Sequence, residues 1–567
     1  MEVKIRDLVK QALKNLGIED VDFVVEHPED LQNGDYSTNV AMVLAKNLKR
    51  NPKELAEEIQ NEISKNLDEE IEKIDAKGGF INFYLSRKFF AGSVEEILNN
   101  KKFGKNHLLD NKKVMVEYTD PNPFKPFHIG HLMTNAIGES MARILEFSGA
   151  TVSRANYQGD VGLHVAKAIY GLIKNPELQD MSVPNNIQSL NIGRAYALGS
   201  EAYVKNKHEI DEINKKIYEK SDEKINEIYD WGFKVTMDAF QDIYEMLGTE
   251  FDFYFLESQM AGVGEKIVRE NLGKIFEESD GAIVFKGEKH DPKLHTRVFI
   301  TSIGLSTYET KELGLTMEKF KVLPDMNLSI VVTATEQADY MKVVAKALFL
   351  IEPEYENKMK HITHGMMRFL EGKMSSRKGN VITGETLIED TKILVSEKMK
   401  DRDFGNDEKE KIISDVAVSA IKYSILKQST GGDIIYDFEK SISFEGDSGP
   451  YLQYSYARAN SVLEKAKSEN ILPDPHMEVA PLEVFEVEKL LYQFGEVVRR
   501  SAEEYEPHYI ANYLIELARS YNSFYGNNVI VDKSDKTSAY KVALTFAFSF
   551  VMKKGLNLLG IVAPERM

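Results

Sequence analysis

The sequence predicts an α/β protein in which a parallel-sheet domain lies between a smaller α+β domain and an all-α bundle. Three observations lead to this prediction. Strand, helix and strand patterns follow one another between residues 114 and 157, as in a βαβ unit. Helix and strand patterns are mixed before residue 108. Beyond residue 445 the apolar residues recur at helical spacing.

The first domain is expected to span residues 1–107. Apolar residues recur at helical spacing in residues 1–18 and 39–63, which predicts helices there. A strand pattern follows at residues 80–85. Residues 104–111 are polar, and we interpret them as a linker to the next domain.

The second domain is expected to span residues 108–385. A strand at 114–119 is followed by a proline-rich loop, a helix at 130–149 and a strand at 151–157. Because a crossover helix makes neighbouring strands parallel, a nucleotide-type site is expected at the carboxyl edge of the sheet.

The rest of the chain is predicted to be mainly helical. Residues from about 170 to 280 are interpreted as a helical insertion that splits the sheet. Strand patterns return at 282–285, 297–302 and 329–333, which we assign to the second half of the same sheet. A connecting helical region and the helical bundle are expected at residues 386–445 and 446–567.

Composition narrows the class of protein. The absence of cysteine excludes disulfide scaffolds and thiolate metal sites. The net charge of −19 counts against a non-specific nucleic-acid binder, although local basic patches are compatible with RNA binding. The first helix pattern is unlike a secretion signal, and the most apolar late stretch, residues 542–552, is too short to span a bilayer. We therefore expect a cytoplasmic protein with no membrane partner.

The first candidate motif is His128-Ile129-Gly130-His131. Its two imidazoles lie on one side of a helix start, directly after a strand, where unpaired N–H groups can bind a phosphate. Gly130 would let a flat ring lie against the backbone. A packing pair or half of a metal site is the alternative interpretation.

The second candidate motif is the stretch of residues 372–379, Gly-Lys-Met-Ser-Ser-Arg-Lys-Gly. Its three cations and two hydroxyls between glycines suit a clamp on a polyphosphate. A basic surface loop is the alternative. The sequence lacks a P-loop, so a Walker-type phosphate site is excluded.

Together these motifs resemble the two signatures of class I aminoacyl-tRNA synthetases, in the family's order. The flanking stretches at residues 117–123, 156–162 and 446–458, and the ending at 558–567, are similar to the arginyl-tRNA synthetase family. The segments 34–41 and 79–83 resemble that family's N-terminal domain. The resemblance implies a class I Rossmann-type catalytic domain, an N-terminal domain that meets the tRNA elbow and a helical anticodon-binding domain.

The resemblance also implies roles for individual residues. Catalytic roles fall on His128, His131, Lys373, Arg377 and Lys378, with Ser376 standing where the usual class I pattern has lysine. ATP contacts fall on Phe127, Gly130, Met366, Met374, Ser375 and Ser376. Arginine contacts fall on Glu117, Asn122, Tyr308, Glu312 and Gln337, with Glu312 where many members have aspartate.

A guanidinium is a planar fork of donors with a permanent charge, so carboxylates and amide oxygens suit its pocket. A surface acid is the alternative for Glu312, and a polar cap is the alternative for Gln337. We expect no resident metal and interpret His164 as structural or at the edge of the ATP pocket.

The implied reaction uses ATP, Mg²⁺, L-arginine and tRNA(Arg), and the family's habit suggests a monomer. Tyr456, Tyr509 and Met567 are candidates for tRNA contacts, with core packing as the alternative for each. Three other functions remain open: a synthetase for another amino acid, a nucleotidyltransferase of the same superfamily, and a non-catalytic RNA-binding relative.

Overall fold

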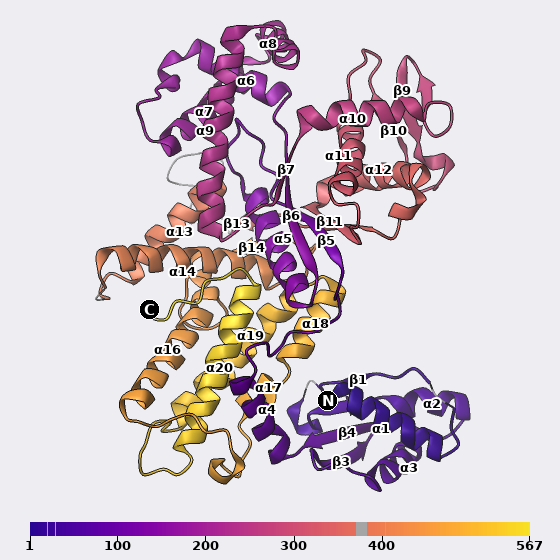
Figure 1. Ribbon diagram of the computed structural model, residues 1–567, viewed down its shortest axis with the longest axis vertical. Helices are drawn as coiled ribbons and strands as arrows, with labels where there is room; N and C mark the ends of the chain where they lie inside the picture. Colours follow the sequence, from indigo (N-terminus) through magenta and orange to yellow (C-terminus); the bar gives the residue numbers. More distant parts are fainter. Residues whose placement is uncertain (20, 29, 370–382, 403) are drawn as a thin grey trace.

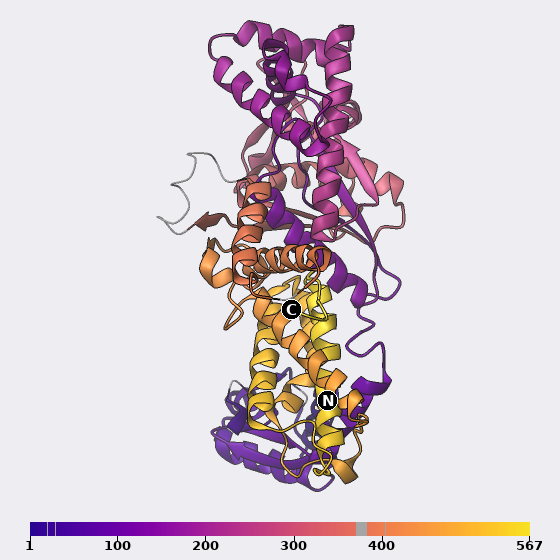
Figure 2. The ribbon, with the colours of Figure 1, turned by 90° about the vertical axis from the view of Figure 1, so that its left-hand side faces the viewer.

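A computed structural model describes residues 1–19, 21–28, 30–369, 383–402 and 404–567. The molecule is elongated. At one end an α+β domain lies beside a helical bundle, and at the other end two lobes project beyond a central sheet (Figures 1 and 2). Among the described residues, no helix is both long enough and apolar enough to cross a membrane.

The N-terminal domain is an antiparallel sheet covered by helices. Its four strands are ordered β1-β2-β4-β3, and the buried faces of α1, α2 and α3 pack on them. The elements are α1 (Glu2–Asn15), β1 (Val25–Glu26), η1 (Leu31–Asn33), β2 (Tyr36–Thr38), α2 (Val40–Leu48), α3 (Pro52–Ser64), β3 (Ile71–Lys77) and β4 (Phe80–Leu85). Helix α4 (Arg87–Asn99) leads to the next domain.

Five parallel strands form the central sheet, in the order β12-β11-β5-β6-β7. They are β5 (Lys113–Glu117), β6 (Thr151–Gln158), β7 (Phe253–Leu256), β11 (Leu328–Ala334) and β12 (Met359–His364). Short apolar runs such as Val114-Met115-Val116 are buried on both faces, as expected for a parallel sheet. The order reverses between β5 and β11, so the crevice at the carboxyl ends of these strands is the natural site for a ligand.

Helix α5 (Ile129–Phe147) connects β5 to β6 and is buried along most of its length. It ends at Ser148, and Gly149 turns the chain with φ of 103°. A side chain at Gly149 would meet Asp110, so both the turn and the close contact require glycine.

Two strands do not belong where the sequence assigned them. β8 (Glu277–Ser279), β9 (Ala282–Lys286) and β10 (Thr296–Ile300) form a separate antiparallel sheet. Of the three strands expected at 282–285, 297–302 and 329–333, only the last, β11, joins the central sheet. The expectation that residues 282–285 and 297–302 extend the parallel sheet is therefore wrong. The short connection between β9 and β10 favours an antiparallel hairpin, because parallel neighbours need a crossover of a dozen or more residues.

Two lobes flank the carboxyl edge of the sheet (Figure 1). One contains α6 (Leu163–Lys174), η2 (Pro176–Gln179), α7 (Asn185–Ala202), α8 (Lys207–Glu219) and α9 (Glu223–Leu247). The other contains the small sheet, η3 (Gly287–Lys289), η4 (Thr335–Gln337), η5 (Pro353–Tyr355), α10 (Glu257–Glu270), α11 (Tyr308–Val322) and α12 (Ala338–Ile351). Strand β7 lies inside the stretch expected to be helical, and it forms the edge of the central sheet.

The C-terminal part is helical and shares one hydrophobic core with α5 and the central sheet. The connecting elements are β13 (Met367–Phe369), α13 (Gly384–Lys398), α14 (Asn406–Leu426), β14 (Ile434–Tyr436) and α15 (Phe438–Ser441). The bundle elements are α16 (Gly449–Ser468), η6 (Met477–Val479), α17 (Glu486–Leu491), α18 (Phe494–Glu504), α19 (His508–Asn527) and α20 (Ser538–Leu558).

Candidate active site

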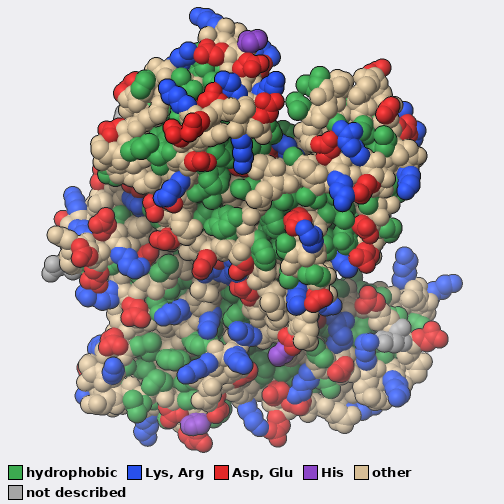
Figure 3. All heavy atoms as spheres, turned by 45° about the horizontal axis from the view of Figure 1, so that its top comes forward, with side chains coloured by type: hydrophobic (Ala, Val, Ile, Leu, Met, Phe, Trp, Pro, Cys, Tyr) green, Lys and Arg blue, Asp and Glu red, His purple; other side chains and the backbone are tan. Residues whose placement is uncertain are grey.

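A polar cavity of about 220 Å³ lies at the carboxyl edge of the central sheet. The strand ends bring together residues that are far apart in the sequence, and α5, α10, α11 and α12 close the sides. Its predicted members are Glu117, Asn122, His128, Gly130, His131, Tyr308, Glu312 and Gln337. Figure 3 shows the surface hollowed between the two lobes, with acidic and basic side chains interspersed around it.

His128 and His131 form the start of α5. The His128 ring caps the helix and stacks on the His131 ring with their centroids 3.4 Å apart. Each Nδ1 accepts from a backbone amide, at 3.4 Å for His128 and 3.2 Å for His131, so the proton of each neutral ring is on Nε2. A side chain at Gly130 would lie only 3.0 Å from the His128 ring.

Burial keeps both imidazoles neutral. Loss of solvent lowers the pKa of His131 well below its usual value, and the neighbouring His128 lowers it further. Burial, and then Lys125, lowers the pKa of His128. The two rings therefore act as neutral hydrogen-bond donors through Nε2, which suits an anionic oxygen that gains charge during a reaction.

Four carboxyl groups line the other side of the cavity: Glu117, Asp120, Glu257 and Glu312. Glu117 forms a buried ion pair with Lys319, and Lys311 donates to Glu257 at 2.8 Å. Burial raises the pKa of Glu312 to about 8, and the nearby Glu117 adds to the rise. The four carboxyl groups therefore suit a cationic ligand.

The sequence matches known families along most of its length. Residues 93–438 match the family described as tRNA synthetases class I (R), catalytic domain. Residues 3–85 match the arginyl tRNA synthetase N terminal domain, and residues 452–567 match the DALR anticodon binding domain. The first of these matches covers more than half of the chain.

The chain belongs to the arginyl-tRNA synthetase family. A curated relative from Clostridium perfringens, named arginine–tRNA ligase, is 30% identical and covers 99% of this chain and 100% of its own. A relative of the same name from Halothermothrix orenii is 29% identical and covers 100% of this chain and 99% of its own. The solved Thermus thermophilus arginyl-tRNA synthetase is 26% identical, with a TM-score of 0.82 over 100% of both chains.

The second signature of the synthetase family lies outside the described residues, together with Lys373, Met374, Ser375, Ser376, Arg377 and Lys378. Its described flank is next to the first signature. Thr383 forms a β-bridge with His128, and the Gly384 amide donates to the Phe127 carbonyl at 2.8 Å.

The other residues predicted from the family resemblance differ in their hydrogen bonds and in their exposure. The Asn122 carbonyl accepts from the Gly159 amide at 3.0 Å, and Gln337 accepts from the Tyr340 hydroxyl at 3.2 Å. Tyr308 is at the rim and is 67% exposed. The Nε2–H of His164 donates to the Gly159 carbonyl at 2.8 Å.

Phe127 and Met366 do not line the cavity. Phe127 is fully buried, and its ring packs against His131 with the centroids 5.3 Å apart. The Phe127 side chain therefore supports His131, and its contact with ATP stays a prediction. Met366 is 51% exposed and leads into β13, beside the segment that is not described.

The candidate tRNA contacts differ in exposure. Tyr456 is 3% exposed and packs in the bundle core, so it is not available to stack on a base. Tyr509 is half-buried, and the Arg500 guanidinium lies 4.0 Å from its ring centroid. Met567 packs beside the cluster formed by α13 and α14.

Three cavity residues were missed from the sequence, Asp120, Glu257 and Tyr340, as was Lys319, the buried partner of Glu117. One signal was readable: Lys319 follows Glu312 by seven residues, so both lie on one face of α11. Glu257 was missed because it follows β7, within the stretch interpreted as a helical insertion.

A larger hollow of about 860 Å³ lies between α13, α14 and the end of α20. Some of its charged groups pair with one another, as in the Lys411–Asp415 pair at 2.7 Å and the Lys392–Glu389 pair at 2.9 Å. We assign the chemistry to the smaller cavity because that cavity contains the two histidines and lies at the carboxyl edge of the parallel sheet.

Proposed function

We propose that the protein is an arginine–tRNA ligase that activates L-arginine with ATP and transfers it to the terminal adenosine of tRNA(Arg). One observation supports this above all: a stacked pair of neutral imidazole donors shares a cavity with a surplus of carboxyl groups. The donors suit the phosphates of ATP, and the carboxyl groups suit a guanidinium.

In the first step the arginine carboxylate attacks the α-phosphorus of ATP, and pyrophosphate leaves. The Nε2–H groups of His128 and His131 donate to phosphate oxygens as charge builds there. Lys373, Arg377 and Lys378 hold the departing pyrophosphate. Glu312 binds the guanidinium, with Glu117, Asn122, Tyr308 and Gln337 shaping the pocket.

Mg²⁺ accompanies ATP in this proposal and neutralises its phosphates. The described residues contain no cluster of three or more His, Asp or Glu side chains that could hold a metal. The ion is therefore expected to arrive on the nucleotide, with oxygen ligands from the phosphates and water.

In the second step the 2′-hydroxyl of the terminal adenosine attacks the arginyl-adenylate. The helical domain reads the anticodon, with Tyr509 and Met567 as candidate contacts, and the N-terminal domain meets the tRNA elbow. Formation of the adenylate is proposed to require bound tRNA. Helix α5 and the bundle share one hydrophobic core. A movement of the bundle when it binds tRNA would therefore shift α5 and its histidines, which supports such coupling.

The test is a charging assay with the full chain, ATP, Mg²⁺ and total tRNA, run with each of the twenty amino acids. Arginine alone should be attached, and arginine-dependent ATP–pyrophosphate exchange should need tRNA. Charging of another amino acid, or exchange without any amino acid, would reject the proposal and favour another class I synthetase or a nucleotidyltransferase.

A further inference from the structure

The N-terminal domain is attached to the C-terminal bundle by polar contacts that are partly buried. Arg87, at the start of α4, pairs with Glu488 of α17 at 2.6 Å and donates to the Pro481 carbonyl at 3.0 Å. The Lys489 ammonium, also on α17, lies 3.4 Å from an Asp35 carboxylate oxygen. Arginine and lysine stay charged at neutral pH, so these contacts do not change there.

A further contact of this interface contains a histidine. His27 follows β1, and its Nδ1 atom lies 2.7 Å from the Asp35 carbonyl oxygen. Its Nε2 atom lies 2.9 Å from the Oε2 atom of Glu496, on α18. The Tyr36 hydroxyl, on β2, donates to the Glu496 Oε1 atom at 2.7 Å. One carboxylate of the bundle is thus bound by two side chains of the N-terminal domain.

Both hydrogen-bond partners of His27 are acceptors. A carbonyl oxygen and an ionised carboxylate cannot donate, so both ring nitrogens must donate, which requires the imidazolium form. Burial raises the pKa of Glu496, but the hydrogen bonds from His27 and Tyr36 keep it below its usual value, so this carboxyl is ionised at neutral pH. His128 and His131 differ from His27, because their Nδ1 atoms accept from backbone amides.

The surroundings of this contact suit a positive ring. The Tyr36 ring centroid lies 4.3 Å from that of His27, and the Tyr492 ring of the bundle lies 5.8 Å away. Aromatic faces carry partial negative charge, which favours a cation. The other charged groups around the contact are the Met1 amino group, which acts on Glu496, and the pairs Asp35–Lys489 and Glu2–Arg499.

Resting on the function proposed above, we propose that protonated His27 is a positioning residue that fastens the N-terminal domain to the anticodon-binding bundle and fixes the distance between two regions that hold tRNA. Loss of one proton leaves a single N–H for two acceptors, so one hydrogen bond is replaced by a contact between lone pairs. Docking is therefore complete below the range in which an exposed histidine titrates, about pH 6.5, and weakens above it.

Distances between labels in the full chain test the docking. The sequence has no cysteine, so two can be introduced as sites for spin labels. Glu57→Cys on α3 and Lys465→Cys on α16 use exposed positions, one in each domain. The distribution of distances should be narrow at about pH 6 and broader at about pH 8.5, where an ordinary histidine is neutral.

Two variants should remove this dependence on pH. His27→Gln has the same donors and acceptor at every pH, so its distances should be broad under both conditions. Glu496→Gln removes the carboxylate from the other domain and should give the same result. His476→Gln is the matched control, because it replaces an exposed histidine of the bundle, and its distances should respond to pH as in the unmodified protein.

Charging kinetics connect the docking to tRNA. The N-terminal domain lies at the end of the molecule away from the two lobes that flank the cavity (Figure 1). At about pH 6.5, His27→Gln should therefore raise the KM for tRNA(Arg) by roughly threefold or more and leave the KM for arginine unchanged. At about pH 8.5 the tRNA constants of the two proteins should be similar.

Three results would overturn the inference. They are distances in the unmodified protein that do not change with pH, a pH response that persists in His27→Gln, and an equal rise of both Michaelis constants in that variant. Failure of the proposed function is distinct, because the unmodified protein would then attach no arginine while the label distances still respond to pH.

Discussion

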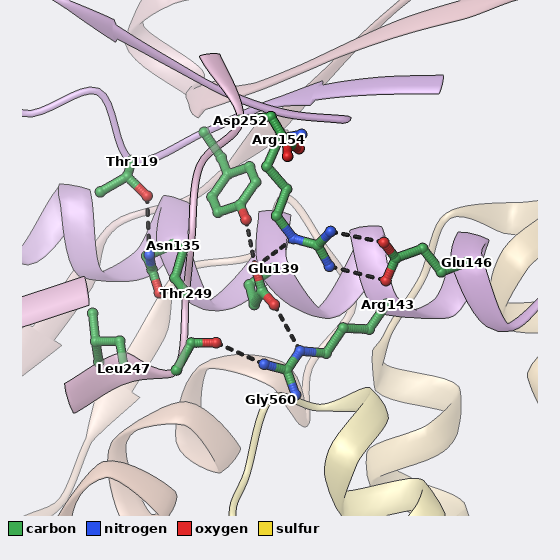
Figure 4. A network of polar contacts seen from close by, with 12 residues as sticks. Thr119, Asn135, Glu139, Arg143, Glu146, Arg154, Leu247, Thr249, Asp252 and Gly560 are labelled. Carbon is green, nitrogen blue, oxygen red and sulfur yellow. Dashed lines mark hydrogen bonds and ion pairs between the residues drawn. The ribbon is translucent and has the colours of Figure 1, made fainter. Parts of the chain in front are cut away.

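The catalytic domain contains two buried clusters of charged side chains, and they differ in whether each charge has a partner within the protein. Around Glu139, on α5, every charge has a partner (Figure 4). Arg143 and Arg154 donate to the two Glu139 oxygens at 2.7 and 3.1 Å, and the Tyr118 hydroxyl also donates to this carboxylate. In the cavity, Asp120 and Glu312 form no direct ion pair with a described residue, and Lys319 only partly offsets their charge.

The pKa values follow this difference. Burial alone would raise the pKa of Glu139, but Arg143 and Arg154 hold it below the usual value. Burial and Glu117 raise the pKa of Glu312 to about 8, because the opposing effect of Lys319 is smaller. A cluster with matched charges stabilises the fold, whereas a cluster with surplus charge is available to a ligand.

The Glu139 cluster also joins distant parts of the chain. Arg143 donates to the carbonyls of Asn557 and Gly248 at 3.0 and 2.6 Å, so α5 is attached to the end of α20 and to the turn after α9. Ser140 donates to the Leu558 carbonyl at 2.9 Å. The helix that carries the histidines is therefore positioned partly by the C-terminal domain.

The largest expected effect is on stability, from Glu139→Gln. This change leaves Arg143 without a carboxylate partner and Arg154 with only the more exposed Glu146, which should cost about 3–5 kcal/mol of unfolding free energy. The urea midpoint should fall, while the arginine KM of the folded fraction should remain unchanged. Glu146→Gln is the matched control, because this partner of Arg154 is 41% exposed and its loss should cost less than about 1 kcal/mol. Equal midpoints for the two variants would break the comparison.

His131→Ala should act on the reaction instead. It removes one Nε2–H donor, so adenylate formation should fall by roughly 10²-fold or more, as for other lost donors to developing negative charge. Single-turnover formation of the adenylate measures this effect. His107→Ala, at an 89% exposed side chain, is the control and should behave like the unmodified protein. A folded His131→Ala variant with near-normal turnover would contradict the assigned role.

Glu312→Gln should act mainly on arginine binding. Without the charge, the KM for arginine should rise by roughly 10- to 100-fold while the KM for ATP changes little. Glu318→Gln lies on the same helix but pairs with Lys321 at 2.9 Å outside the cavity, so it should have no such effect. A larger change in the ATP constant than in the arginine constant would move Glu312 out of the proposed guanidinium site.

Much of the catalytic domain was predictable because its signals are local. The β5–α5–β6 unit follows directly from its apolar periods, and the polar residues after β5 mark the carboxyl edge of the sheet. The assignment of residues 282–285 and 297–302 to that sheet was wrong because a strand pattern does not identify its partner strand. Pairing depends on contacts between segments distant in sequence.

The site was predictable only in part for the same reason. The two histidines and Glu312 are next to recognisable motifs, and the structure brings them to one cavity. Asp120 was not singled out, because its left-handed backbone and its bond to the Tyr157 amide arise only after β5 and β6 pair. Tyr456 was misjudged because an aromatic residue at helical spacing fits a core as well as a stacking surface.

The smallest expected effect is a pH dependence of arginine binding. Glu312 faces Glu117, Lys319, Glu257 and Glu309, and burial followed by Glu117 raises its pKa to about 8. A guanidinium binds the carboxylate and not the neutral acid, so binding must release a proton at neutral pH. Affinity should therefore rise with pH by a factor approaching tenfold per unit below pH 8 and level off above it.

The inhibition constant of δ-guanidinovalerate, an arginine analogue without the α-amine, reports this rise between pH 6.5 and 8.5 in the exchange reaction, because that compound has no amine that titrates in the range. Glu312→Gln should abolish the slope, whereas Glu318→Gln should retain it. A flat profile in the unmodified protein would mean that Glu312 is already ionised when the cavity is empty. The surplus of negative charge would then be compensated within the protein, and the contrast with the Glu139 cluster would disappear.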